Sequence, residues 1–318
     1  MILIISERKD VSTNKVIDWL KYLNKDFFRL NFEDSAEIEF SIDHNHSKTL
    51  LVVNSVKYDI DEFKTIYYRR GDVKYRYNLH PNVFYDKINQ YFSQEWKMLK
   101  QLVYSHPYST RIGDFYKEIN SNKLIDNQTA VKAGFKIPKT IATSSKKNLL
   151  EFLEKIECAI VKPLHGIISI ISKDLRLVGI DHYSTINKGS ISICPESFFP
   201  IIAQEYIEKS FEIRVFFIKS NLYSMAIFSQ SDNGTKFDFR ESREDGNETR
   251  SVPYLLAIDI KKKVLDFINL SGLTTGSIDL IVNKRQEVLF LEVNPAGQFD
   301  WVSSNCNYYI EKKIAELL

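Results

Sequence analysis

The sequence has little excess charge, few cysteines and no long apolar run. It contains 43 Lys and Arg residues and 41 Asp and Glu residues, so the formal net charge is only +2. This balance gives no polybasic signature of nucleic-acid binding. No stretch approaches the roughly 20 apolar residues that span a bilayer. The apolar residues 1–5 are followed by Ser6, Glu7 and Arg8, so this run is too short for a signal peptide. We therefore expect neither nucleic acid nor membrane as a partner.

The cysteines are three in number and widely spaced: Cys158, Cys194 and Cys306. They match neither a disulfide framework nor a zinc-binding pattern. A reducing cytoplasm is the location that this usage predicts, with all three cysteines as unreactive core thiols.

The first part of the chain has the pattern of a small α/β domain. The 318 residues correspond to two or three domains at roughly 100–200 residues each. A strand is predicted over residues 1–5, a helix with Ser12 as N-cap, and strands over 49–53 and 65–68. A long amphipathic helix begins near Lys87 and ends before His106 and Pro107. The first domain boundary is expected near there.

Two further units are predicted after this boundary. In the second, Asn120 or Ser121 caps a helix that Gly134 closes, Ser145 caps another, and residues 158–163 and 167–172 form strands. The third has strands over 201–207, 212–218 and 222–228, a polar loop over 240–250, a helix ended by Gly272, and a hairpin of 277–282 with 288–294.

The C-terminal hairpin brings acidic side chains together on apolar strands. Glu292 and Asn294 share one face because side chains alternate along a strand. With a loop of residues 284–287, Val288 pairs with Asn283, and Asp279 lies directly opposite Glu292, about 4.5–5.5 Å away at Cβ. Two carboxylates this close repel unless a cation or proton intervenes, and oxygen-only ligands favour Mg²⁺. The alternative is that both acids face water at a sheet edge.

Further candidate positions lie at a strand end, at the start of a helix and on the face of a strand. Lys162 follows a buried strand, and Lys123 opens a helix, where a cation is favourable only beside an anion. The segment Gln204, Glu205, Tyr206 and Ile207 ends a strand, where backbone groups can face a flat base. Glu212 and Arg214 share a face of the next strand. The alternatives are solvated lysines, an ordinary strand end and a structural ion pair.

The order of these residues is more specific than any one of them, and over residues 110–300 it resembles the ATP-grasp superfamily. The resemblance implies an α/β (α+β) chain with an ATP-grasp fold: a pre-ATP-grasp domain (1–110), a central subdomain (111–195) and a C-terminal subdomain with the metal site (196–318). Implied cofactors are ATP and two Mg²⁺ ions. Implied roles are nucleotide binding for Lys123 and Lys162, base contact for Gln204, Glu205, Tyr206 and Ile207, ribose contact for Glu212, phosphoryl stabilisation for Arg214, and metal binding for Asp279, Glu292 and Asn294.

Other segments resemble the graspetide (microviridin-type) ligases, closest to the peptide maturases of grasp-with-spasm clusters. The likeness lies in segments 6–10, 16–20, 67–70, 236–240 and 250–254. It implies a ligase that activates Asp or Glu side chains of a ribosomal precursor peptide and joins them to Ser, Thr or Lys side chains as ω-esters or ω-amides. It further implies a leader segment that docks on the enzyme, a homodimer and a partner maturation protein.

Several basic residues and one acid are expected on the substrate side. Arg69, Arg70, Arg240 and Arg250 are candidates for gripping acidic substrate side chains, because guanidinium groups match carboxylates bidentately. The alternative is that Arg69 or Arg70 is buried at a domain seam. Asp238 is the candidate base, and the alternative is that it pairs with Arg240. The phosphate loop departs from the family, since the run from His165 to residue 172 has one glycine, Gly166.

Two other functions fit parts of the same pattern. A ligase for a small amino-acid or dipeptide acceptor would share every nucleotide-binding residue and differ only in the acceptor pocket. A nucleotide-binding adaptor without catalysis would lack, or fail to bring together, Arg214, Asp279, Glu292 or Asn294.

Overall fold

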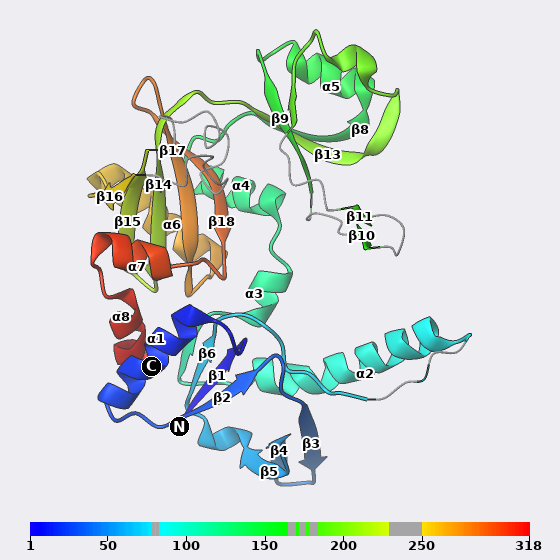
Figure 1. The fold of residues 1–318 in the computed structure, drawn as a ribbon, viewed down its shortest axis with the longest axis vertical. Coiled ribbons are helices and arrows are strands. Elements are labelled where there is room, and N and C mark those ends of the chain that lie inside the picture. Colours follow the sequence, from blue (N-terminus) through cyan, green and yellow to red (C-terminus); the bar gives the residue numbers. More distant parts are fainter. Residues whose placement is uncertain (78–79, 81–82, 165–169, 172–175, 178–183, 229–249) are drawn as a thin grey trace.

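The chain begins with a parallel sheet whose strand order is β2-β1-β6-β7 (Figure 1). The computed structural model describes residues 1–77, 80, 83–164, 170–171, 176–177, 184–228 and 250–318. The elements of this first unit are β1 (Ile2–Ser6), α1 (Val11–Tyr22), β2 (Phe27–Asn31), β6 (Thr65–Tyr68) and β7 (Thr110–Ile112). Because β7 joins this sheet, the first unit extends just past the predicted limit of residue 110. The sheet order reverses between β1 and β6, and their carboxyl ends form the edge where ligands gather in such sheets.

The N-cap of α1 differs from the prediction. Asp10, not Ser12, caps the helix, and its carboxylate accepts a hydrogen bond from Thr13 N. Ser12 lies buried inside the first turn. Both residue types favour N-caps, so composition alone did not separate them.

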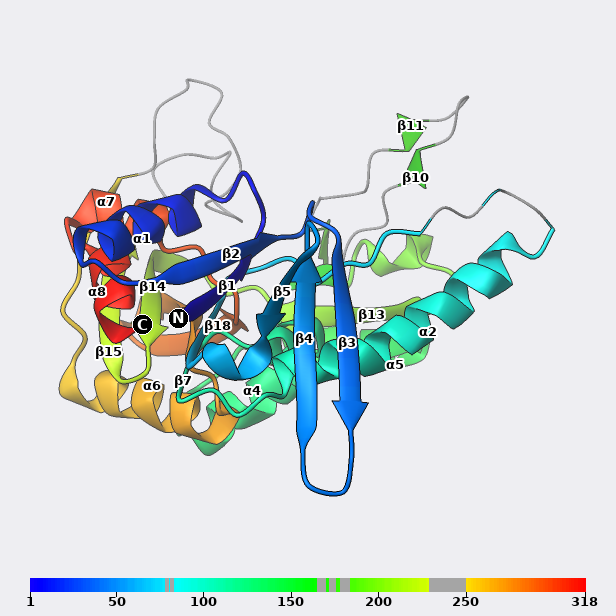
Figure 2. The ribbon, with the colours of Figure 1, turned by 90° about the horizontal axis from the view of Figure 1, so that it is seen from below.

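Two projections extend from the first unit (Figure 2). One is an antiparallel three-stranded sheet, and the other is a long helix that ends just before His106, as predicted. Their elements are β3 (Ala36–Ile42), β4 (Ser47–Val53), β5 (Val56–Asp59), η1 (Ile60–Glu62) and α2 (Tyr85–Tyr104).

Two short helices lead away from this unit: α3 (Phe115–Ile119) and α4 (Lys123–Lys132). The N-cap of α4 is Asn122, whose Oδ1 accepts from Leu124 N at 2.9 Å. The predicted caps Asn120 and Ser121 are wrong, because Asn120 is the C-cap of α3. Gly134 follows α4 with a φ of 87°, as a helix-closing glycine does.

The central unit is an antiparallel sheet of order β12-β9-β13-β8, covered by α5. Its strand β13 starts earlier than predicted and pairs with β8 and β9, so this sheet extends beyond residue 195. Ser145 caps α5, as predicted. The elements are β8 (Thr140–Ser145), α5 (Lys146–Leu153), β9 (Ala159–Pro163), β10 (Ile170–Ile171), β11 (Arg176–Leu177), β12 (Ser184–Ile186), η2 (Ile191–Ile193) and β13 (Ser197–Glu205).

The C-terminal unit is an antiparallel sheet of order β16-β15-β14-β17-β18. One face packs on α4 and α6, and the other packs on α7 and α8. The elements are β14 (Lys209–Ile218), β15 (Asn221–Ile227), β16 (Ser251–Pro253), α6 (Ile258–Ser271), β17 (Thr275–Asn283), β18 (Val288–Asn294), α7 (Asp300–Cys306) and α8 (Ile310–Leu317).

One hydrophobic core joins the first and last units. It combines side chains of β1 and α1, such as Ile4 and Leu20, with Phe216 on β14, Phe299 and Ile314. Figures 1 and 2 both show α1 beside α8. The central unit instead has a core of its own, drawn from residues 141–203. Among the described residues, no helix has both the length and the apolar character for crossing a bilayer.

Candidate active site

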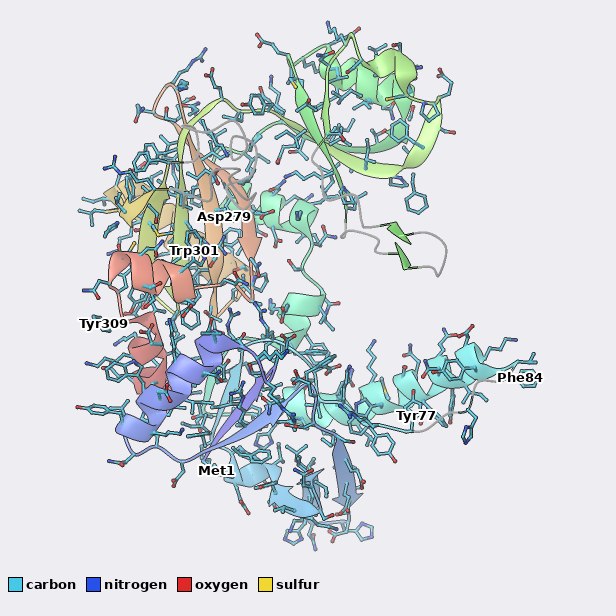
Figure 3. The ribbon with its side chains drawn as sticks, in the orientation of Figure 1. Met1, Tyr77, Phe84, Asp279, Trp301 and Tyr309 are labelled. Carbon is cyan, nitrogen blue, oxygen red and sulfur yellow. The ribbon has the colours of Figure 1, made fainter. Side chains whose placement is uncertain are left out.

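Three charged side chains form a row across the C-terminal sheet. Arg214 on β14 pairs in register with Asp279 on β17, and Asp279 pairs with Glu292 on β18. The predicted placement of Asp279 opposite Glu292 is therefore confirmed. Figure 3 marks Asp279 on the sheet, with Trp301 of α7 nearby.

The register that produces this row differs from the predicted one near the turn. Val288 pairs with Val282 rather than with Asn283. The turn of the hairpin is therefore one residue longer than predicted, covering residues 283–287 instead of 284–287. A β-bulge between the pairs of Asp279 and Leu280 then restores the expected pairing at Glu292. Bulges of this kind re-aim side chains beside active sites, and the sequence pattern does not reveal them.

Asp279 is a buried acid held by a cation. It is 4% exposed, and Arg214 Nη1 lies 3.1 and 3.2 Å from its two carboxylate oxygens. The Arg214 guanidinium carbon also lies 5.5 Å from the centre of the Trp301 ring. The alternative that Asp279 faces water at a sheet edge is therefore wrong.

Lys123 supplies the second cation of the row. Its Nζ lies 3.2 Å from Glu292 Oε2, although Lys123 is the first residue of α4. The carboxylate of Glu292 thus stands close to the helix N-terminus, where a negative charge is favourable. This contact joins α4 to the edge strand of the sheet.

Asp126, one turn further along α4, was missed by the sequence analysis. Burial raises its pKa to about 6, with the charge of Glu292 adding to the rise and a hydrogen bond from Ser121 opposing it. A lone Asp in a helical segment carries no sequence signal of this environment, because only packing places it near Glu292.

The oxygen donors of the row suit a magnesium ion. Asn294 ends β18 on the same face as Glu292, and its Oδ1 accepts from Ala296 N at 3.1 Å. No group of three His, Cys, Asp or Glu side chains able to hold a metal occurs within the described part of the chain. Mg²⁺ needs only one or two carboxylates beside water and phosphate oxygens. The two carboxylates and the amide oxygen therefore fit this ion.

Glu212 lies on the face of Arg214 and forms a buried ion pair with Lys209. Both side chains are 6% exposed. Residues three apart do not share a face in a regular strand, but a bulge between Lys209 and Phe211 brings the two together. Sequence reasoning missed Lys209 for this reason.

The predicted base-binding residues lie at the end of β13 in the central sheet and directly after it. Gln204 is buried and its Nε2 donates to Thr140 Oγ1 at 3.2 Å. The N–H of Glu205 donates to Lys139 O, and that of Tyr206 donates to Cys158 O. Both amides are thus used within the protein. Lys162 on β9 pairs in register with Ile202 of β13, so Lys162, Gln204 and Glu205 lie on a different sheet from the acidic row. Tyr206 and Ile207 follow directly after β13.

The predicted substrate residues are spread over the molecule. Arg69 is 4% exposed and lies 4.0 Å from Asp10 Oδ2, which matches the alternative of a buried arginine at a domain seam. Arg70 Nε lies 3.3 Å from the same oxygen but keeps 30% of its side chain exposed. Arg250 is exposed above the Phe228 ring. Asp238, Arg240, His165 and Gly166 lie outside the described residues.

The sheets and the charged row define an ATP-grasp fold, and comparisons with known proteins place the chain more narrowly. Residues 120–318 match the model of the RimK-like ATP-grasp domain. The chain belongs to this family and is an ATP-dependent enzyme of the ATP-grasp ligase class.

Solved structures share the fold over the whole chain. A RiPP-associated ATP-grasp ligase of Chryseobacterium gregarium, in complex with ADP and a leader and core peptide, is 22% identical, with a TM-score of 0.78 over 100% of this chain and 96% of that one. The macrocyclase MdnC of Microcystis aeruginosa, bound with precursor peptide MdnA, is 21% identical, with a TM-score of 0.78 over 100% and 99%. The ligase PsnB with precursor variant, Mg and ADP is 14% identical, with a TM-score of 0.74 over 99% and 96%.

A curated relative covers a smaller part. An uncharacterised protein of Methanocaldococcus jannaschii is 38% identical over 103 residues, which are 31% of this chain and 24% of that protein. The chain thus matches about a quarter of that relative's length.

Proposed function

We propose that this protein is an ATP-dependent macrocyclising ligase. It activates Asp or Glu side chains of a ribosomal precursor peptide as acyl phosphates and joins them to Ser or Thr side chains as ω-esters, or to Lys as ω-amides. The observation that carries the proposal is the row of Arg214, Asp279 and Glu292 with Lys123 beside it. The shared fold of ligases solved with leader and core peptides supports the substrate class.

The nucleotide is assigned to both sheets. Lys162 and the segment from Gln204 to Ile207 would bind phosphate and base from the central sheet, while Glu212 would bind the ribose. Asp279, Glu292 and Asn294 would hold two Mg²⁺ ions. When bound, the ions would neutralise the β- and γ-phosphates. Lys123 already faces the Glu292 carboxylate and is placed to exchange it for a phosphate oxygen.

The reaction has two steps. A carboxylate oxygen of the core peptide attacks the γ-phosphorus, the bond to the β-phosphate oxygen breaks, and ADP leaves. Arg214 offsets the negative charge on the transferred group. A hydroxyl or amine of the same peptide then attacks the acyl carbon, phosphate leaves, and the proton passes to a base, for which Asp238 is proposed. Each ring therefore forms with the net loss of one water from the peptide.

The peptide substrate makes the second step intramolecular. Because the acid and the acceptor are held on one chain, the activation barrier of this step can be lowered by up to ~7–11 kcal/mol. Arg70 and Arg250 keep exposed surface and would grip acidic side chains, together with Arg240. The proposal includes a cytoplasmic homodimer and a partner maturation protein.

The test is the intact mass of an acidic precursor peptide that contains Ser, Thr and Lys, after incubation with enzyme, ATP and Mg²⁺. We expect the loss of one or more waters, which requires ATP and disappears in Glu292→Ala. Glu287→Ala is the matched control, because Glu287 is an exposed carboxylate in the turn of the same hairpin and pairs with Lys136. It should retain full conversion.

The remaining outcomes separate the other functions. ATP hydrolysis driven by free amino acids or dipeptides, without a change in peptide mass, would identify the small-acceptor ligase instead. If the protein binds ATP but does not hydrolyse it with any acceptor added, it would be identified as an adaptor. Mild base separates the products, since it cleaves esters and leaves amides intact.

A further inference from the structure

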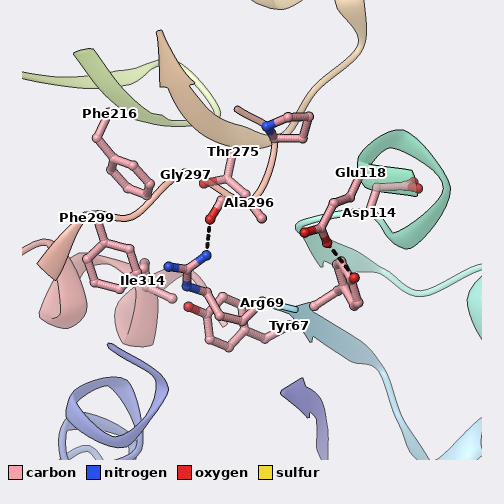
Figure 4. Close-up of a pocket in the computed structure, with 12 residues that line it drawn as sticks. Tyr67, Arg69, Asp114, Glu118, Phe216, Thr275, Ala296, Gly297, Phe299 and Ile314 are labelled. Carbon is pink, nitrogen blue, oxygen red and sulfur yellow. Dashed lines mark hydrogen bonds between the residues drawn. The ribbon is translucent and has the colours of Figure 1, made fainter. Parts of the chain in front are cut away.

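Arg69 connects the first sheet to the turn that follows the last strand of the C-terminal sheet. It directly follows β6, and its backbone N–H donates to Ile5 O at 3.0 Å, which fixes the start of its side chain. Its Nη1 donates to Ala296 O, and its guanidinium carbon lies 5.5 Å from the centre of the Phe299 ring. Figure 4 shows the side chain pointing from β6 towards Ala296.

The turn that receives this bond also fixes Asn294. Ala296 N donates to Asn294 Oδ1 at 3.1 Å, and Gly297 N donates to Asn294 O at 3.0 Å. The peptide between Ala296 and Gly297 is therefore bonded on both sides, by Arg69 at its oxygen and by Asn294 at its N–H. A Cβ on Gly297 would overlap Ser277 of β17, so the turn lies directly against the strand that carries Asp279.

The surroundings of Arg69 leave no room for a substrate carboxylate. The cavity beside Arg69 has a volume of about 10 Å³, which is close to the smallest volume that can hold one water molecule. Its lining includes Tyr67, Thr275 and Phe299, and Arg69 itself is 4% exposed. Arg69 is thus enclosed by the protein, in contrast to Arg70.

We propose that Arg69 is a positioning residue that orients the side-chain oxygen of Asn294 for metal binding, by fixing Ala296, whose N–H donates to that oxygen. The inference rests on the proposed role of Asn294 as a magnesium ligand. It assigns to the first domain a direct part in shaping the metal site of the last one. Partners of metal ligands typically change metal affinity 10–100-fold when they are removed.

The experiment measures Mn²⁺ binding in the presence of ADP, by loss of the free-ion electron paramagnetic resonance signal. Arg69→Met keeps an unbranched side chain but removes the donor, and Arg69→Lys restores one. We expect at least tenfold weaker Mn²⁺ binding in Arg69→Met, partial recovery in Arg69→Lys, and metal-free ADP affinity within twofold of the native protein.

Lys25→Met is the matched control. Lys25 also joins the first and last units by donating to main-chain oxygens, Ala315 O and Glu316 O, at 3.0 Å each, far along the chain from Asn294. It should lower thermal stability without changing Mn²⁺ affinity. Equal weakening of Mn²⁺ binding in Lys25→Met and Arg69→Met would overturn the proposal, because the effect would then follow domain packing in general.

Asn294→Ala separates the proposed ligand role of Asn294 from the positioning role of Arg69. If it leaves Mn²⁺ binding unchanged, the proposed ligand role of Asn294 fails, and the inference fails with it. If Asn294→Ala weakens Mn²⁺ binding and Arg69→Met does not, the ligand role stands and only the role of Arg69 is refuted. Thermal unfolding of Arg69→Met and Arg69→Lys, measured alongside, shows that the binding data come from folded protein.

Discussion

Each carboxylate proposed to hold Mg²⁺ already has a cation of the chain beside it. Arg214 contacts Asp279, and Lys123 contacts Glu292. Acids that face each other on paired strands repel, so the two cations make the close approach of Asp279 and Glu292 tolerable in the protein without nucleotide. If nucleotide and metal bind here as proposed, both ion pairs would rearrange, so changes at any of these four side chains should affect the others.

Asp279→Asn should therefore lower stability as well as metal binding. The change leaves the buried Arg214 guanidinium without its carboxylate partner, and breaking a buried pair in this way costs about 3–5 kcal/mol of unfolding free energy. Urea unfolding measures the loss. Glu287→Gln, in an exposed pair on the same hairpin, should change stability far less. Equal effects of the two changes would contradict a buried pair.

Asp126 should give the protein a pH-dependent stability of defined sign. Its pKa rises from 3.8 to about 6 on folding, mainly through burial, so the folded state binds more protons between these values. Stability from this group is complete below pH 4 and is lost as pH rises through about 6. Unfolding in urea with a chelator present should show the native protein losing stability relative to Asp126→Asn across this window. A constant difference would refute the raised pKa.

Individual residues were predictable where a regular strand decides their neighbours. Glu292 and Asn294 share a face, as the alternation of side chains predicts. The pairing of Asp279 with Glu292 agrees with the prediction only because a longer turn and a β-bulge offset each other, and the sequence shows neither. Lys209 was not predicted, because it meets Glu212 only through a bulge, and Asp126 was not, because it meets Glu292 only through the packing of α4 on β18.

At the level of elements, α4 is the part that links helix capping to the site. Asn122 accepts hydrogen bonds from Leu124 N and Ile125 N, and the next residue, Lys123, reaches Glu292. The direction in which Lys123 leaves the helix therefore depends on the cap. The same helix packs on α6, which fixes its axis against the sheet.

Asn122→Ala should weaken both the helix and nucleotide binding. Loss of an N-cap costs about 1 kcal/mol, and a frayed first turn lets Lys123 move away from the phosphate side. Calorimetry with ADP measures the second effect, which we expect to be several-fold. Ser145→Ala removes the cap of α5 in the central unit and should cost stability while leaving ADP affinity unchanged. The same ADP affinity in both variants would speak against the role of the cap.

Elements with a clear apolar period were predicted, and those set by tertiary contacts were not. The amphipathic helix α2 and the hairpins of the C-terminal sheet agree with the sequence pattern. Strand β3 was not assigned because only its first part alternates between buried and exposed residues. Its last four residues are exposed on both faces, so the sequence there shows no apolar period. The helices α7 and α8 gain their order from the shared core with α1, which the local sequence does not show.

For the whole molecule, the distribution of cores predicts how the chain opens. The first and last units share one core through α1, α8 and β14, whereas the core of the central unit stays within residues 141–203. The residues proposed to bind nucleotide and metal are divided along the same line, with Lys162 and Gln204 on the central sheet and Asp279 and Glu292 on the last. A nucleotide bound by these residues would therefore join two parts that the hydrophobic packing leaves separate.

Hydrogen–deuterium exchange should report this division. Without nucleotide, β8, β9 and β13 should exchange as one group and faster than β1 and β14, because they belong to the smaller, separate core. ATP with Mg²⁺ should slow exchange most in β9 and β13, since binding stabilises the unit it bridges. Glu292→Ala should abolish most of this protection although Glu292 lies on the other sheet. Protection of β9 that survives in Glu292→Ala would mean that the central unit binds nucleotide alone, without the acidic row.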